Sequence, residues 1–105
     1  MAQLTIADLQ GYLAMKYKEG RTSSGSFMKL VEEVGEVAEA LNQLEGRKAK
    51  EDQGSLEAEL VDVIHYAVAI ASINQIDLTT AIIEKDKKAA LKYSQTPNLE
   101  EFLEK

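Results

Sequence analysis

Two pairs of acidic residues have a spacing that could hold a metal ion. Glu33 and Glu36 are three residues apart, and so are Glu59 and Asp62. On an α-helix, residues three apart project from the same side, one turn from each other. If two such helices pack side by side, four carboxylates face a shared space, and a divalent cation relieves their repulsion better than protonation does.

The chemistry of such a site follows from its ligands. Oxygen ligands alone favour hard ions, with Mg²⁺ before Zn²⁺ or copper. Magnesium usually retains several waters and completes its coordination with substrate phosphates. The four carboxylates therefore predict phosphoryl or nucleotidyl transfer, for which water is the simplest acceptor.

Each acid pair also has a simpler interpretation. Glu33 and Glu36 could belong to the solvated side of an amphipathic helix. Glu59 and Asp62 are harder to explain, because the run Leu60–Ile73 is apolar around nearly its whole circumference. A carboxylate in such surroundings is costly unless it is paired or holds a metal. Lysines from the following helix could reach it, so a salt bridge remains open.

The acidic residues are concentrated in one part of the chain. Twelve Lys and Arg against eighteen Asp and Glu give a net charge of −6. No basic residue lies between Lys50 and Lys85, where the chain carries seven acids: Glu51, Asp52, Glu57, Glu59, Asp62, Asp77 and Glu84. This balance argues against a nucleic-acid backbone as the main partner, but not against a small phosphate ligand that brings its own metal.

Four stretches of helical periodicity must position these residues. The predicted helices are Thr5–Glu19, Ser26–Glu45, Leu56–Gln75 and Leu78–Tyr93. Their expected N-caps include Thr5 with Asp8, Ser55 and Asp77, and the expected stops include Gly20 and Gly46. The polar segment Arg21–Phe27 is predicted to be a loop that could close over a substrate. No strand pattern competes, so the predicted fold class is all-α, a compact four-helix domain.

The remaining composition bounds the class of protein. A chain of 105 residues is one domain, 1–105, in which 95–105 is expected to form a weak helical turn or a mobile tail. It has no cysteine, no apolar run of membrane-spanning length and no signal-peptide pattern, which predicts a cytoplasmic protein. One layer of helices can hardly cover the apolar third helix, so we expect a homo-oligomeric helical bundle without nucleic-acid or membrane partners.

The acidic motifs also resemble a known family. Glu32-Glu33-Val34-Gly35-Glu36, followed by Glu59-Leu60-Val61-Asp62, is similar to the EExxE…ExxD signature of the MazG-like nucleotide pyrophosphohydrolases. The resemblance covers most of the chain from Phe27 to Tyr93. It implies an all-α fold and a Mg²⁺-dependent enzyme, with Mn²⁺ as a substitute, that hydrolyses a nucleoside triphosphate to the monophosphate and pyrophosphate. It also implies a homodimer or homotetramer whose sites lie near subunit contacts.

Matching the motif residue by residue assigns roles. Glu33, Glu36, Glu59 and Asp62 correspond to the metal ligands, and Glu32 or Glu33 to the group that orients or deprotonates the attacking water. The lysine-rich segment resembles the family's Lys-x-x-Lys-Asn-x-x-Arg-Tyr, with Ala89 in place of the asparagine and Lys92 in place of the arginine. The residues expected to bind substrate are Lys85, Lys88, Lys92, Tyr66 and Tyr93.

Several alternatives remain open at this point. The lysines could be a solvated helix face, and Tyr66 could belong to the core. His65, the single histidine, is interpreted as a partly buried structural residue. For the whole chain, the alternatives to a nucleoside triphosphate hydrolase are an enzyme of the same fold acting on phosphoribosyl-ATP or dUTP, or a non-catalytic helical interaction module.

Overall fold

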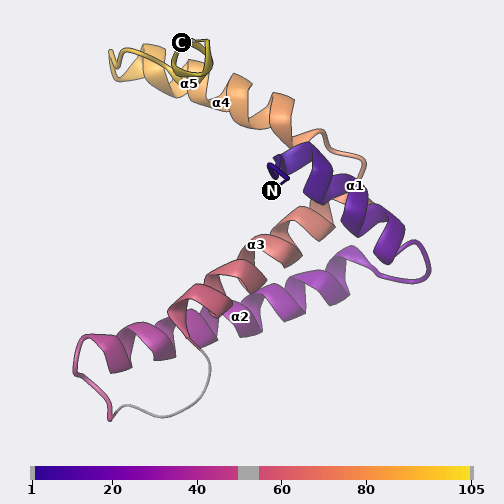
Figure 1. The fold of residues 1–105 in the computed structure, drawn as a ribbon, viewed down its shortest axis with the longest axis vertical. Helices are drawn as coiled ribbons and strands as arrows, with labels where there is room; N and C mark the ends of the chain where they lie inside the picture. The colour runs from indigo at the N-terminus through magenta and orange to yellow at the C-terminus, as the bar shows by residue number, and fades with distance from the viewer. Residues whose placement is uncertain (1, 50–54, 105) are drawn as a thin grey trace.

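The computed structural model describes residues 2–49 and 55–104, and every regular element in these two ranges is a helix. The helices are α1 (Ile6–Lys16), α2 (Ser23–Leu44), α3 (Leu56–Ile73), α4 (Leu78–Lys92) and α5 (Leu99–Leu103) (Figure 1). The all-α fold class predicted from the sequence is therefore confirmed. The four predicted long helices are all present, and α5 is added.

Local sequence signals explain where the helices begin. Thr5 and Asp8 form a reciprocal capping box at the start of α1, with each side chain accepting a hydrogen bond from the other residue's backbone N–H. Ser55 caps α3 and Asp77 caps α4, as the sequence predicts. Gly20 follows α1 with φ of 91°, in the left-handed region that glycine adopts without steric cost.

The start of α2 differs from the prediction. The Thr22 hydroxyl accepts a hydrogen bond of 2.9 Å from the Gly25 N–H, so the helix begins at Ser23 and not at Ser26. The prediction of a loop over Arg21–Phe27 is therefore wrong beyond Thr22. Serine and glycine are poor helix formers, but the Thr22 cap overrides their propensity at this end of the helix.

Helices α2 and α3 run antiparallel side by side, and α1 crosses the end of this pair (Figure 1). The core lies where α1 meets α3 and contains Leu13, Val68 and Ala69, each at most 3% exposed. Ile6, Leu9, Tyr17 and Leu78 pack around it.

Helix α4 turns away from the α2–α3 pair after a four-residue connection and packs on α1 and α5 (Figure 1). The side-chain amide of Gln10 in α1 holds this junction. Its Nε2 donates to the Ile76 carbonyl at 2.7 Å, and its Oε1 accepts from the Leu78 N–H at 2.9 Å. Helix α4 therefore lies at a sharp angle to α3 (Figure 1).

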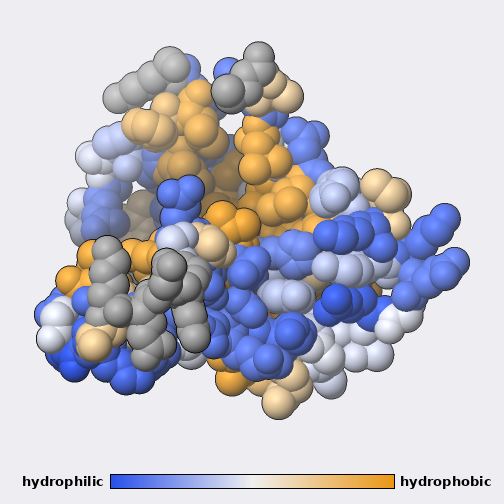
Figure 2. All heavy atoms as spheres, turned by 60° about the horizontal axis from the view of Figure 1, so that its bottom comes forward, coloured by the Kyte–Doolittle hydropathy of each residue, from blue (hydrophilic) through white to orange (hydrophobic). Residues whose placement is uncertain are grey.

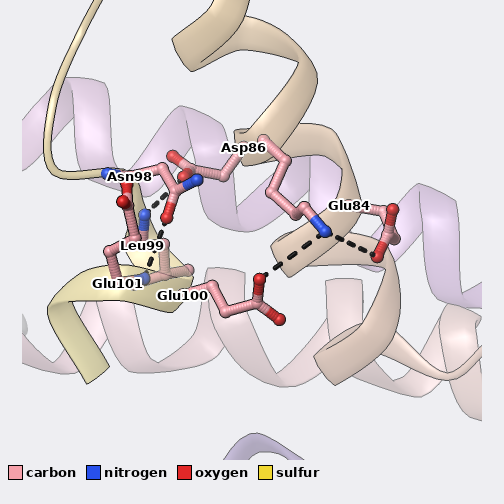
Figure 3. A network of polar contacts seen from close by, with 7 residues as sticks. Glu84, Asp86, Asn98, Leu99, Glu100 and Glu101 are labelled. Atoms are coloured by element: carbon pink, nitrogen blue, oxygen red, sulfur yellow. Dashed lines mark hydrogen bonds and ion pairs between the residues drawn. The ribbon is translucent and has the colours of Figure 1, made fainter. Parts of the chain in front are cut away.

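The short helix α5 is tied to α4 by polar contacts (Figure 3). Asn98 and Glu101 form its capping box, and Asp86 of α4 accepts a 2.6 Å hydrogen bond from the Leu99 N–H. Lys87 lies between Glu84 and Glu100, with N–O distances of 3.9 and 3.5 Å. The segment expected to be a weak turn or a tail thus contains a capped helix.

The molecule is more open than a single compact bundle. Its radius of gyration is 16.7 Å, whereas a compact domain of this length has a value of about 13 Å. Large apolar side chains remain exposed on α2 and α3: Phe27, Met28, Val31, Val34, Leu60, Val61 and Ile64. Figure 2 shows broad orange apolar areas on the surface turned to the viewer. None of the described helices has the length and apolar character needed to cross a bilayer.

Candidate metal centre

Three of the four predicted metal ligands converge. Glu33 of α2 and Glu59 and Asp62 of α3 each offer one carboxylate oxygen, and these oxygens all lie within 4.8 Å of one another. All three residues are partly buried. The antiparallel packing of α2 on α3 brings the middle of α2 opposite the first turns of α3, which explains why residues 26 or more positions apart share one site.

The electrostatics of this cluster fit a cation. Partial burial raises the pKa of Glu33 above its ordinary value, and the charge of Asp62 raises it further. Hydrogen bonds to Glu59 and Asp62 and the charge of Glu59 act in the same direction. Three carboxylates in one place are therefore costly in their ionised form, and a hard cation with oxygen ligands is the group that removes this cost.

The other two acids of the motif lie outside this group of three. Glu36 is exposed and lines a small hollow of about 140 Å³ together with Glu39, Gln43 and Glu59. Glu32 is exposed and faces Lys29, with an N–O distance of 3.6 Å. The structure thus places Glu36 beside Glu59 at the edge of the cluster, and it points Glu32 toward solvent.

The predicted substrate-binding lysines are not brought to the carboxylates. Lys85, Lys88 and Lys92 are exposed on α4, whose main packing contacts are with α1 and α5. The salt bridge that the sequence left open, from these lysines to the acids of α3, is not formed among the described residues. Tyr93 caps α4, is 63% exposed and lies 5.4 Å from the Lys92 ammonium, so it is also remote from the cluster.

Tyr66 belongs to a group of rings that the sequence did not reveal. Its ring centroid lies 4.8 Å from that of His65, and the Tyr17 hydroxyl is hydrogen-bonded to His65 Nε2 at 2.7 Å. The Arg21 guanidinium lies 4.3 Å from the Tyr17 ring centroid and 5.7 Å from that of Tyr66. No sequence pattern signals this group, because its members come from α1, α3 and the α1–α2 connection.

The surroundings of His65 agree with a structural histidine. Partial burial lowers its pKa, the positive charges of Lys16 and Arg21 lower it further, and the charge of Asp62 opposes them. A neutral imidazole accepts the hydrogen bond from Tyr17 through one ring nitrogen. His65 is therefore a half-buried hydrogen-bond partner next to the carboxylates, as the sequence indicates.

Two known proteins are similar to this chain. The uncharacterized protein YpjD of Bacillus subtilis (strain 168) is 36% identical over 89 residues, which cover 77% of this chain and 79% of YpjD. The crystal structure of iMazG from Vibrio DAT 722 superimposes with a TM-score of 0.66 at 27% identity. That match covers 88% of this chain and 100% of the iMazG chain.

The family comparison covers the helices that carry the site. The MazG nucleotide pyrophosphohydrolase domain matches residues 21–93, more than two thirds of the chain, and this range includes α2, α3, α4 and the three clustered carboxylates. The shared fold, the matched range and the acid cluster agree, and the chain belongs to the family of MazG nucleotide pyrophosphohydrolase domains.

Proposed function

We propose that this protein is a Mg²⁺-dependent pyrophosphohydrolase that converts a nucleoside triphosphate, normal or damaged, ribo or deoxy, into the monophosphate and pyrophosphate. Such an enzyme would clean the nucleotide pool in the cytoplasm. The observation that carries the proposal is the convergence of Glu33, Glu59 and Asp62 from two helices within 4.8 Å. The family of the chain supports the reaction type.

In this proposal the clustered carboxylates hold the metal. Glu33, Glu59 and Asp62 bind it directly, and Glu36 reaches it from the edge of the cluster beside Glu59. When bound, Mg²⁺ neutralises the triphosphate and lowers the pKa of coordinated water. Mn²⁺, which prefers similar oxygen ligands, would substitute.

Glu32 and Glu33 are the proposed residues that handle the attacking water. The ion pair of Glu32 with Lys29 is largely exposed, and such pairs contribute little stability, so it does not hold Glu32 away from the site. Glu33 already sits in the cluster, where a bound cation would keep its carboxylate ionised and able to accept a proton. The two acids therefore orient the water and accept its proton.

The lysines of α4 are proposed to bind the outer phosphates from a second copy of the chain. Lys85, Lys88 and Lys92 make no ion pair within the described residues and lie away from the carboxylates of their own chain. The basic α4 and the acidic, partly apolar α2–α3 surface are complementary in charge. A homodimer or homotetramer would bring Lys85, Lys88, Lys92 and Tyr93 to the partner's site, while Tyr66 contacts the nucleotide from the same chain as Asp62.

The test is pyrophosphate release from a nucleotide panel with and without Mg²⁺. The panel contains the common ribo- and deoxynucleotides, dUTP, inosine triphosphate and phosphoribosyl-ATP. Glu59→Gln and Glu36→Gln should each lower the rate by about 100-fold or more. The first variant removes a direct metal ligand, and the second removes the carboxylate beside that ligand. Glu57→Gln, an exposed acid on the same helix turn, is the matched control and should keep the wild-type rate.

Two results would contradict the proposal. A wild-type rate equal to that of Glu59→Gln on every nucleotide would show that the acids do no chemistry. Activity that is the same with Mg²⁺ and with excess chelator would remove the metal from the reaction.

A further inference from the structure

A hollow lies between α1 and α3, beside the ring group described above. Its volume is about 250 Å³, and its lining includes Leu13, Tyr17, Lys18, Arg21, Ala69 and Ile73. Small-molecule sites usually have volumes of roughly 300–1,000 Å³. The hollow therefore has room for a flat ring system but not for a whole nucleotide.

The hollow is aligned with the carboxylate cluster along α3. Asp62, Tyr66, Ala69 and Ile73 are spaced by four, three and four residues, so they lie on one face of the helix. The rise of 1.5 Å per residue puts Ala69 about 10 Å beyond Asp62 along the axis. A ligand whose phosphates reach Asp62 can extend along this face, past Tyr66, into the hollow.

The rim of the hollow suits a planar ring. The Arg21 guanidinium, itself planar, lies 4.3 Å from the Tyr17 ring centroid and 5.7 Å from that of Tyr66. Guanidinium groups and aromatic rings stack on any nucleobase, because every base has a flat π-face. Tyr17 is held in place by its hydrogen bond to His65, so this surface is preformed.

The charged side chains that line the hollow are hydrogen-bond donors. Arg21 and Lys18 donate only, and neither can accept. The Ser72 hydroxyl donates to the Gln10 carbonyl at 3.0 Å, so toward a ligand it can only accept, and these two cations outweigh it. No acidic or amide side chain of the described residues lines the hollow, and no described carboxylate forms an ion pair with Arg21. A ring edge with carbonyl oxygens satisfies these donors, whereas an exocyclic amino group would face them unpaired.

We propose that the hollow between α1 and α3 binds the nucleobase of the substrate and that Arg21 selects bases whose edge carries carbonyl oxygens. The inference rests on the proposed function, since it assigns the substrate class of that site. Hypoxanthine, guanine, uracil and thymine present such oxygens, and adenine and cytosine present an amino group at the corresponding position. Arg21 is the specificity residue, and Tyr17, which lines the hollow, offers the stacking surface.

A binding experiment tests the hollow without relying on catalysis. Inosine and adenosine 5′-monophosphates differ in the purine ring by an oxygen in place of an amino group, and calorimetry measures the dissociation constant of each. We expect wild type to bind inosine monophosphate at least about tenfold more tightly than adenosine monophosphate. Equal affinities, or no measurable binding of either nucleotide, overturn the proposal.

Two variants then test whether Arg21 causes the preference for inosine over adenosine nucleotides. Arg21→Met should remove the preference, while Arg47→Met, which changes an exposed arginine bonded to Asn42, should keep it. The ratio of kcat/KM for inosine over adenosine triphosphate should follow the same pattern. A preference that survives in Arg21→Met overturns the role of Arg21. Discrimination between the monophosphates without any pyrophosphate release refutes the proposed hydrolase and leaves the base site standing.

Discussion

The folded structure disfavours the ionised form of the Glu33 side chain. Its pKa is raised by partial burial, then by the charges and hydrogen bonds of Asp62 and Glu59. A carboxyl group with a folded-state pKa above its unfolded value of 4.5 favours folding while it is protonated. That contribution is fully present below pH 4.5 and is lost as the pH rises through the raised folded pKa.

Glu33→Gln should therefore stabilise the metal-free protein at neutral pH. The glutamine amide has the shape of the protonated carboxyl group, and it cannot ionise. The gain in melting temperature over wild type should be present at pH 7 and disappear as the pH falls toward 4.5. Thermal unfolding in chelator across this range measures it, with Glu57→Gln as the control that shows no such trend. A Glu33→Gln variant less stable than wild type at pH 7 would contradict the raised pKa.

Magnesium should stabilise wild type but not variants that lack a carboxylate of the cluster. A ligand that binds only the folded state stabilises it according to its concentration relative to Kd, by about 2.7 kcal/mol at a hundredfold excess. Mg²⁺ should thus raise the melting temperature of wild type, and leave that of Glu59→Gln and Asp62→Asn nearly unchanged. An identical shift in all three proteins would mean that the ion binds elsewhere. No shift in wild type, and none with nucleotide, would favour the non-catalytic interaction module.

At the scale of helices, one side chain decides the direction of α4. Gln10 bonds both the Ile76 carbonyl and the Leu78 N–H, and thereby joins α1 to the connection between α3 and α4. Helix α4 packs mainly on α1 and α5, and its first residue, Leu78, packs against the α1–α3 core. The orientation of the lysine-bearing helix therefore depends on this amide.

Gln10→Ala should destabilise the protein by about 1–3 kcal/mol, the cost of leaving polar groups of a partly buried junction without partners. Urea unfolding measures the loss. Hydrogen exchange should also become faster at Leu78 and in the first turn of α4. Gln3→Ala, at an exposed position before α1, is the matched control and should change stability by less than about 0.5 kcal/mol. Equal stability of the two variants would show that the junction does not depend on Gln10.

At the scale of the whole molecule, the open shape and the exposed apolar side chains of α2 and α3 lead us to predict that another copy of the chain covers this surface. Val61 and Ile64 are 58% and 51% exposed in the first half of α3, whereas the core residues Val68 and Ala69 lie further along the same helix. Burying apolar area contributes about 25 cal/mol per Å², so leaving this surface in water forgoes stability that association recovers.

The native mass should accordingly be a multiple of 11.6 kDa. Ile64→Asp should shift the protein toward monomer, because it places a charge in the apolar contact, and Gln3→Asp should not. Light scattering after size exclusion measures the mass. Since α4 is proposed to act on the partner's site, the monomeric variant should also lose pyrophosphate release. A wild-type mass of 11.6 kDa would refute the assembly, and an active monomer would refute the shared site.

The sequence alone was sufficient to predict the four long helices and to single out the acidic residues from which the cluster is drawn. Helical periodicity and the caps at Thr5, Ser55 and Asp77 are local, so they predict α1, α3 and α4 directly. The i, i+3 acids also follow from local geometry, which is why Glu59 and Asp62 could be paired before their partner helix was known. At the start of α2, propensity pointed to a loop, but the hydrogen bond from the Gly25 N–H to the Thr22 hydroxyl caps a helix that begins at Ser23.

Only the tertiary structure decided which residues from distant segments of the chain lie close together. It selected Glu33 from the acids of α2 as the partner of Glu59 and Asp62, and it left Glu32 and Glu36 outside that group. It separated the lysines of α4 from the carboxylates, and it assembled Tyr17, Arg21, His65 and Tyr66. Helix crossing and the direction of connections set these distances, and they depend on packing across the whole chain rather than on spacing within one helix.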